Sequence, residues 1–124
     1  MKGERRAVAR YRDKLPVEID IDGQVYKDAA SIEISLTGLC VSCEGGLAGS
    51  LFSKHIQVTP AENLFANLVI KTPKSTGLIN NIYCVAKVIS VNRASQSRYL
   101  IGLKFLEFRD DCQEMWQNYI ANKN

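Results

Sequence analysis

The sequence predicts a mainly β domain in which six or seven short antiparallel strands form a small barrel or sandwich and one helix ends the chain. Three observations predict this class. Apolar and polar residues alternate in most of residues 15–105, glycine-containing turns separate the alternating segments, and the apolar spacing changes to a helical period from residue 108. With 124 residues, of which 46% are hydrophobic, the chain is long and apolar enough to fold as one domain without disulfides.

The first two strands are predicted as a hairpin. Residues 15–21 alternate between apolar and polar side chains, which indicates a half-buried strand. Asp22-Gly23 follows at once and is typical of a two-residue hairpin turn. We therefore expect a short second strand to return over residues 24–26.

A second pair of strands is predicted around a glycine. Alternation over residues 32–36 predicts a strand, Thr37-Gly38 marks a turn or bulge, and residues 39–43 resume the alternation. The pattern predicts a core face and an outer face for the first of these strands. The residues expected toward the core are Ile32, Ile34 and Leu36, and those expected on the outer face are Glu33 and Ser35.

The second half of the chain predicts three further strands and the helix. The strands are expected at residues 64–71, 79–91 and 99–105, with a polar turn over residues 92–97. Residues 108–121 form the expected helix, which we predict to close a barrel mouth or cover a sheet edge, with Asp110 or Asp111 as its cap. Its apolar face is predicted from Phe108, Cys112, Met115, Trp116 and Tyr119.

The positive charge of the chain is concentrated at its beginning. Residues 1–14 hold six basic and two acidic side chains, whereas the other 110 residues hold ten basic and eleven acidic ones. We therefore divide the chain into a flexible basic arm (1–14), a β-barrel (15–107) and a helix (108–121). A basic arm suits an anionic partner such as a nucleotide, a nucleic acid or an acidic protein surface.

The four cysteines predict neither a metal site nor disulfides. Cys40 and Cys43 form a C-x-x-C, but no second pair with zinc spacing follows, and the lone His55 has no cysteine nearby. We expect reduced, mostly buried thiols. No apolar run reaches the length of a membrane span, and no apolar stretch follows the charged N-terminus, so we expect a cytoplasmic location.

Two short motifs carry the candidate chemistry. The first is R-x-x-x-R, formed by Arg6 and Arg10, with Arg5 beside it. The second reads Glu33-Ile34-Ser35-Leu36-Thr37-Gly38, an acidic-x-S-x-x-G pattern placed on an early strand. About 25 residues and one predicted hairpin separate the two motifs.

In these motifs the chain resembles the PilZ domain family, the bacterial receptors for cyclic di-GMP. The family pattern is R-x-x-x-R followed by [D/N]-x-S-x-x-G, and residues 99–106 also look like its last barrel strand. The resemblance covers roughly residues 4–120 and implies a six- or seven-stranded antiparallel, split β-barrel of PilZ type with a C-terminal α-helix. The sequence departs from the pattern at Glu33, where the family has Asp or Asn.

The ligand-binding residues implied by the resemblance are Arg5, Arg6, Arg10, Glu33, Ser35 and Gly38. An arginine fork can bond to guanine O6 and N7, and it can clamp a phosphate or stack on a base. A carboxylate can accept from guanine N1–H and from its amino group, and Ser35 can donate or accept beside it. Gly38 allows a positive φ or a close backbone approach.

We therefore expect a non-enzymatic receptor that binds cyclic di-GMP, orders its arm and changes a surface for a partner protein. The family implies partners in motility, pilus, polysaccharide or biofilm machinery. We expect no cofactor, no metal, no membrane insertion and no nucleic acid polymer as partner. Two alternatives stay open: a PilZ-fold adaptor that does not bind cyclic di-GMP because of Glu33, and a basic-armed β-barrel that binds RNA or DNA, which the low aromatic content of 8% disfavours.

Overall fold

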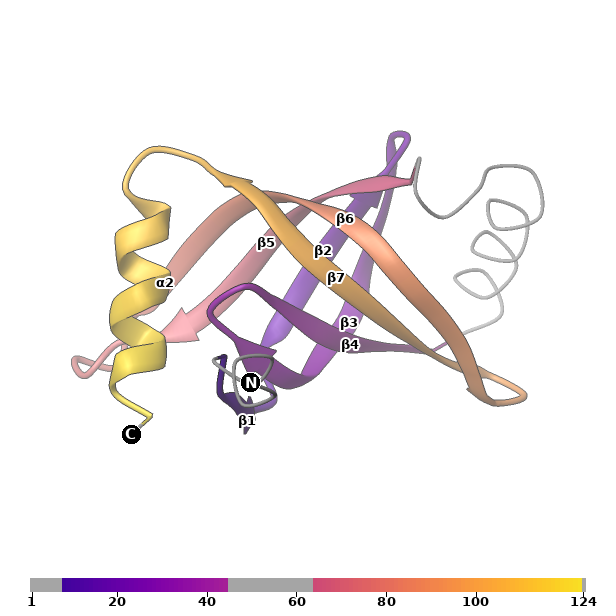
Figure 1. Cartoon of the computed structure of the whole chain (residues 1–124), viewed down its shortest axis with the longest axis horizontal. Helices are drawn as coiled ribbons and strands as arrows, with labels where there is room; N and C mark the ends of the chain where they lie inside the picture. Colours follow the sequence, from indigo (N-terminus) through magenta and orange to yellow (C-terminus); the bar gives the residue numbers. More distant parts are fainter. Residues whose placement is uncertain (1–7, 45–63, 124) are drawn as a thin grey trace, which may run out of the picture.

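A computed structural model of the chain describes residues 8–44 and 64–123, which form an antiparallel barrel and a helix (Figure 1). The elements are β1 (Arg10–Arg12), β2 (Pro16–Ile21), β3 (Gln24–Ser35), β4 (Gly38–Glu44), β5 (Phe65–Pro73), β6 (Ile79–Ser95), β7 (Arg98–Phe108) and α2 (Cys112–Ala121). The strand order β1-β3-β2-β5-β6-β7-β4, with a further pairing of β3 to β4, closes six strands into a barrel and leaves β1 on the edge of β3. The predicted mainly β barrel with a C-terminal helix is confirmed.

The Asp22-Gly23 turn joins β2 to β3 as the sequence predicts. Asp22 and Gly23 have φ values of 53° and 84°, the two positive values that a type I′ hairpin turn requires. The Asp20 carboxylate accepts a hydrogen bond from the Gly23 N–H at 3.0 Å, which holds the turn. The returning strand is longer than predicted, because β3 runs without a break through Ser35 and joins the two segments expected at residues 24–26 and 32–36.

A β-bulge in β3 changes which side chains reach the core. The pairing of β3 with β4 shifts between Ser31 and Glu33, so that Ile32 is an extra residue on its strand. Ile34 is buried as predicted, but Ile32 is only half-buried and Leu36 is 46% exposed. The expectation of three core residues is therefore wrong for Ile32, because of the bulge, and for Leu36, because the strand ends at Ser35 before the alternation reaches it.

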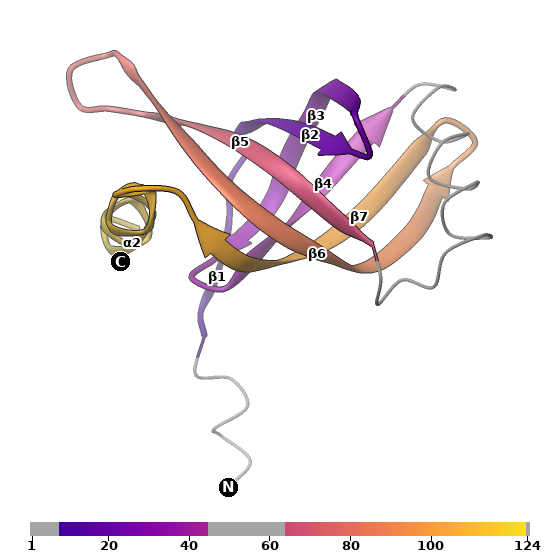
Figure 2. The same cartoon turned by 90° about the horizontal axis from the view of Figure 1, so that it is seen from above.

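The strands β6 and β7 form a long hairpin that extends through most of the predicted polar turn. Residues 92–95 continue β6, so only residues 96 and 97 join the two strands. The Arg93 side chain stabilises this tip, where it donates to the carbonyl groups of Ser95 and Gln96 at 3.1 Å. The β5–β6 hairpin, in contrast, reaches past the end of the barrel where α2 lies (Figure 2).

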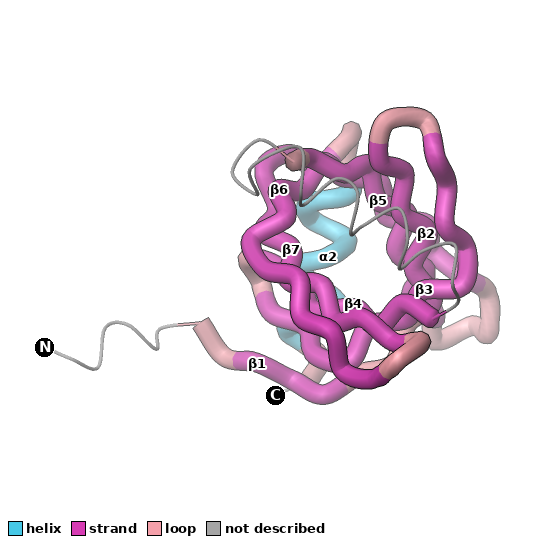
Figure 3. Tube along the Cα trace, turned by 90° about the vertical axis from the view of Figure 1, so that its right-hand side faces the viewer, coloured by secondary structure: helices cyan, strands magenta, loops and turns pink. Residues whose placement is uncertain are grey.

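The helix α2 lies across one end of the barrel (Figure 3). Cys112, Trp116 and Ile120 are its buried residues, and Trp116 is completely inaccessible to solvent. Of the two predicted positions, a barrel mouth or a sheet edge, the helix takes the first. Phe108, which was expected on the helix, ends β7 instead. Asp111 is the N-cap residue, but its carboxylate makes no capping hydrogen bond, so the predicted side-chain cap is wrong.

The four cysteines are free thiols. Cys43 is buried and the neighbouring Cys40 half-buried, as expected for opposite faces of β4. Burial raises the pKa of the Cys43 and Cys84 thiols to about 12, so both stay protonated at neutral pH. Among residues 8–44 and 64–123 no three His, Cys, Asp or Glu side chains gather as a metal site, and His55 lies outside that part. Within the same ranges no helix is long and apolar enough to cross a bilayer.

Candidate functional site

The short strand β1 brings the two sequence motifs together. It pairs with the end of β3, with Arg10 opposite Ser35 and Arg12 opposite Glu33. In this register the Arg10 guanidinium lies diagonally across from Glu33, and its Nη1 is 3.7 Å from the Glu33 Oε1. The two side chains are 74% and 44% exposed, so the ion pair stabilises the fold by at most about 1 kcal/mol. A ligand can therefore separate the pair at little cost.

Ser35 is buried rather than exposed, which corrects the predicted outer-face position. Its hydroxyl accepts hydrogen bonds from the N–H groups of Thr37 and Gly38 at 3.3 and 3.2 Å, and it donates to the Gly38 carbonyl at 3.2 Å. The hydroxyl thus holds the β3–β4 turn, a use that alternation alone does not indicate.

Gly38 begins β4 where that strand passes very close to β7. A Cβ added at Gly38 would lie 2.2 Å from the Leu103 carbonyl oxygen, far inside any real contact. Of the two reasons given for this glycine from the sequence, the close backbone approach is the one that applies.

The helix contacts the same turn from the end of the barrel that it covers. The indole N–H of Trp116 donates to the Ser35 carbonyl oxygen at 2.9 Å. The indole ring also packs edge-on against Phe105, with centroids 5.5 Å apart. Trp116 was expected only as a core residue of the helix, so this bond to the motif is a contact that the sequence does not show.

The segment after β1 is fastened to both β3 and α2. The Ser31 hydroxyl accepts from the Leu15 N–H at 2.8 Å and donates to the Asp13 carbonyl at 2.6 Å. The Asp13 carboxylate accepts from the hydroxyl of Tyr119 and, at 2.6 Å, from the ammonium of Lys123 near the end of α2. The base of the basic arm and the C-terminal end of the helix therefore share one polar network.

This network predicts an acid-sensitive contribution to stability. Burial alone would raise the pKa of Asp13, but the hydrogen bonds from Lys123 and Tyr119 outweigh it and hold that pKa below its usual value of 3.8. A group whose pKa is lowered by folding stabilises the fold above its unfolded pKa and loses this effect as the pH falls through the folded value. We expect Asp13→Asn to lower the free energy of unfolding at pH 7 by about 1.5 kcal/mol.

The check is urea denaturation of the wild type and Asp13→Asn between pH 7 and pH 2. The difference between the two proteins should shrink only once the pH falls toward and below 3.8. Asp28→Asn, which changes an exposed carboxylate on β3, is the control and should leave stability unchanged. A difference that stays constant down to pH 2 would contradict the assignment.

A groove of about 720 Å³ includes Arg12, the residue opposite Glu33 in the β1–β3 register, but neither Arg10 nor Glu33 lines it. Its charged lining residues are the cations Arg12, Lys14 and Arg98 and the carboxylates Asp13, Asp28 and Glu44. Arg98 is fixed in place, because its Nε donates to the Ser42 hydroxyl at 2.8 Å. Of the predicted site residues, the structure thus brings Arg10, Glu33 and the Ser35–Gly38 turn together, while Arg5 and Arg6 lie outside the described residues.

A family model for the PilZ domain matches residues 4–122 of the chain. The chain belongs to the PilZ domain family. The resemblance inferred from the two motifs is thereby confirmed over nearly the whole sequence. A comparison with curated protein sequences gives no significant match for this PilZ domain.

Two solved structures share the fold of this PilZ domain. One is the Bacillus subtilis inhibitor of motility MotI/DgrA, with a TM-score of 0.70, 18% identity, and 95% of this chain aligned to 50% of that one. The other is the Borreliella burgdorferi PlzA protein in complex with c-di-GMP, with a TM-score of 0.57, 12% identity, and 98% of this chain aligned to 55% of that one. The PilZ domain therefore spans about half the length of either protein.

Proposed function

We propose that this PilZ domain is a non-enzymatic receptor for cyclic di-GMP. The observation that carries the proposal is the meeting of Arg10 and Glu33, which come from two separate motifs and lie 3.7 Å apart on an exposed strand edge. One side chain can bind a guanine or phosphate as a donor, and the other can accept from the guanine edge. Family membership and the ligand bound by PlzA support the same ligand.

In this proposal the arginines and the carboxylate hold opposite edges of the ligand. Arg10 exposes 74% of its side chain and is free to turn its guanidinium from Glu33 toward a base or phosphate. Arg5 and Arg6 add further donors from the same arm. Glu33 accepts from guanine N1–H and from the amino group once Arg10 has released it. Two charge-assisted contacts to the ligand then replace one exposed ion pair.

The strands beside Glu33 offer a row of small side chains on which the purine rings can lie. The residues opposite one another across β3, β4, β7 and β6 are Glu33, Cys40, Gly102 and Ser90, so this row carries small side chains. Two residues further along β7 from Gly102, Lys104 lies directly opposite Lys87. Like charges facing across strands are unfavourable, and a phosphate between them would relieve the repulsion.

Ser35 and Gly38 serve the site by shaping it. The Ser35 hydroxyl is fully engaged in the β3–β4 turn, and Gly38 lets β4 lie against β7. Together they fix the end of β3, on which Glu33 sits two residues earlier. We assign them positioning roles, which differs from the direct ligand contact that the motif alone suggests for Ser35.

Binding at the arm would reach the helix through Asp13. Arg10 and Asp13 lie three residues apart, and the Asp13 carboxylate accepts from Tyr119 and Lys123 of the α2 end. A ligand that repositions the arm would change the contacts of Asp13 with Tyr119 and Lys123, and hence the surface around α2. We propose that a partner protein binds this surface differently once the ligand is bound. The name of MotI, an inhibitor of motility, supports a protein partner.

The test is a calorimetric titration with cyclic di-GMP. We expect binding by the wild type and a roughly 10- to 100-fold weaker affinity for Arg10→Ala, because a charged hydrogen bond worth about 1.5–3 kcal/mol is lost. Arg93→Ala, which removes a guanidinium from the distant β6–β7 tip, is the matched control and should bind like the wild type. Equal weakening by both variants would show a general charge effect and reject the site.

A second candidate is a PilZ-fold adaptor that works by protein contact without the nucleotide. The specific observation that favours it is that Glu33, which departs from the family pattern, already forms an ion pair with Arg10. Glu33→Asp shortens the carboxylate by one methylene and restores the family residue. If the wild type gives no heat with cyclic di-GMP and Glu33→Asp binds it, Glu33 is the cause of the lost nucleotide binding, and the adaptor proposal is favoured over the receptor proposal.

A further inference from the structure

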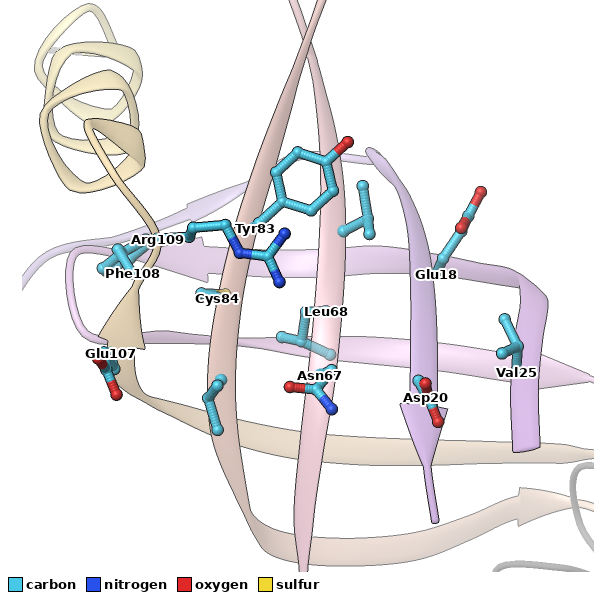
Figure 4. Close-up of a pocket in the computed structure, with 12 residues that line it drawn as sticks. Glu18, Asp20, Val25, Asn67, Leu68, Tyr83, Cys84, Glu107, Phe108 and Arg109 are labelled. Carbon is cyan, nitrogen blue, oxygen red and sulfur yellow. The ribbon is translucent and has the colours of Figure 1, made fainter. Parts of the chain in front are cut away.

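A second groove lies on the opposite wall of the barrel from Arg10 and Glu33. It has a volume of about 400 Å³ and is formed by the outer faces of β2, β5 and β6 with the end of β7 (Figure 4). The wall is opposite because β5 and β6 are separated from β3 and β4 on both sides by other strands of the closed barrel. Neither sequence motif contributes a residue to it, so the groove is distinct from the proposed nucleotide site.

Two cross-strand rows build the groove. In the first, Asp20, Asn67, Val85 and Glu107 lie opposite one another in turn. In the second, Glu18 pairs with Val69 and Val69 with Tyr83. The middle residues are Asn67 and Val85 in the first row and Val69 in the second, and Tyr83 exposes 36% of its surface. The floor is therefore a largely apolar sheet face that faces solvent.

Carboxylates stand on both sides of this floor. Figure 4 shows Glu107 on one side and Glu18 and Asp20 on the other, with Asn67 between them. Among the lining residues the sole cation is Arg109, whose guanidinium lies over the Tyr83 ring, 5.1 Å from its centroid. Glu18 already pairs with the Lys71 ammonium at 3.4 Å, so the acidic character of the groove comes from Asp20 and Glu107, on a chain whose formal net charge is +3.

We propose that this groove docks a segment of a partner protein in which arginine or lysine alternates with apolar residues. The apolar floor takes the apolar side chains, and the carboxylates at the two sides pair with the cations. Along the groove β2, β5 and β6 are paired on both edges, whereas the pairing of β7 with β4 ends at Lys104. The floor therefore offers no free backbone ladder, and recognition on it must come from side chains, which favours a peptide defined by its sequence over strand addition.

The experiment uses a nine-residue peptide in which arginine and valine alternate, titrated into the ¹⁵N-labelled protein. We expect the amide signals that move to be those of Val69, Tyr83, Val85 and Glu107. We expect Glu107→Arg to weaken binding roughly fivefold or more, because an attractive contact becomes repulsive. The matched control is Asp28→Arg, an identical charge change on an exposed β3 residue outside the groove, which should have no effect.

Three outcomes would overturn the proposal. One is an equal loss of affinity for Glu107→Arg and Asp28→Arg, which would mean non-specific charge attraction. Another is equal binding of a peptide with serine in place of valine, which would mean that the apolar floor is not used. The third is displacement by spermidine at the same concentration as the peptide, which would assign the groove to small cations instead. None of these results depends on cyclic di-GMP binding.

Discussion

Replacing Trp116 with alanine is expected to lower the free energy of unfolding by about 3–5 kcal/mol. The indole is completely buried in α2, packs edge-on against Phe105 and lies at 6.0 Å from the Tyr119 ring. Its removal leaves a cavity at the closed end of the barrel and leaves the Ser35 carbonyl without its 2.9 Å donor. A loss of this size is a large part of the 5–15 kcal/mol that typically stabilises a domain.

Urea denaturation followed by far-ultraviolet circular dichroism is the suitable measurement, because Trp116 is the sole tryptophan and its fluorescence disappears with it. Trp116→Phe keeps most of the ring but removes the N–H donor. This variant should therefore remain folded, with a free energy of unfolding about 1–2 kcal/mol below that of the wild type. Equal stability of Trp116→Phe and the wild type would show that the bond to Ser35 contributes nothing. If Trp116→Ala lowers the free energy of unfolding by less than about 1 kcal/mol, the buried packing of the indole does not stabilise the fold as expected.

The parts of the fold that follow local rules could be predicted from the sequence. Asp22-Gly23 predicts its hairpin because only a few residue types accept two successive positive φ values. The helix is recognised from the spacing of Cys112, Trp116 and their neighbours, because one face of a helix repeats every three to four residues. These signals depend on residues close together in the chain, so the sequence alone is enough to predict the turn and the helix.

The bulge at Ser31–Glu33 is different, because its cause lies in distant segments. Ser31 turns inward to bond the Asp13 carbonyl and the Leu15 N–H, and nothing in residues 27–36 indicates this. The bond from Trp116 to Ser35 likewise joins residues 81 positions apart. Alternation treats each strand alone, so it assigned Ile32 and Leu36 to the core and Ser35 to the surface.

The candidate site shows the same division. The two motifs name the candidate residues, and the β1–β3 register places Arg10 beside Glu33. The motifs did not indicate that Ser35 and Gly38 are structural neighbours of the helix and of β7. The exposed Arg10 and Glu33 and the buried Ser35 and Gly38 are close together in the motifs, and only the packing shows which of them face solvent and which hold the turn.

The substitution Gly38→Ala is also expected to have a large effect. It should lower the free energy of unfolding by about 3 kcal/mol, the upper part of the usual range for overpacking. The new Cβ would lie 2.2 Å from the Leu103 carbonyl oxygen and 3.2 Å from the Lys104 Cα, and both are backbone atoms that cannot rotate away. Either β4 or β7 must move, although seven residue pairs hold them together. Because Ser35 bonds the Gly38 N–H, the turn beside Glu33 moves as well.

Gly102→Ala provides the matched control in the neighbouring strand. Its Cβ would meet the Ser90 Oγ at 2.5 Å, a side-chain atom that can change rotamer, so the cost should be clearly smaller. Thermal denaturation gives the stability of both variants, for which Gly102→Ala is the control, and titration of folded Gly38→Ala with cyclic di-GMP reports on the turn. We expect Gly38→Ala to lose both stability and affinity. If Gly102→Ala is as damaging as Gly38→Ala, the rigid contact with the β7 backbone is not what requires glycine at position 38.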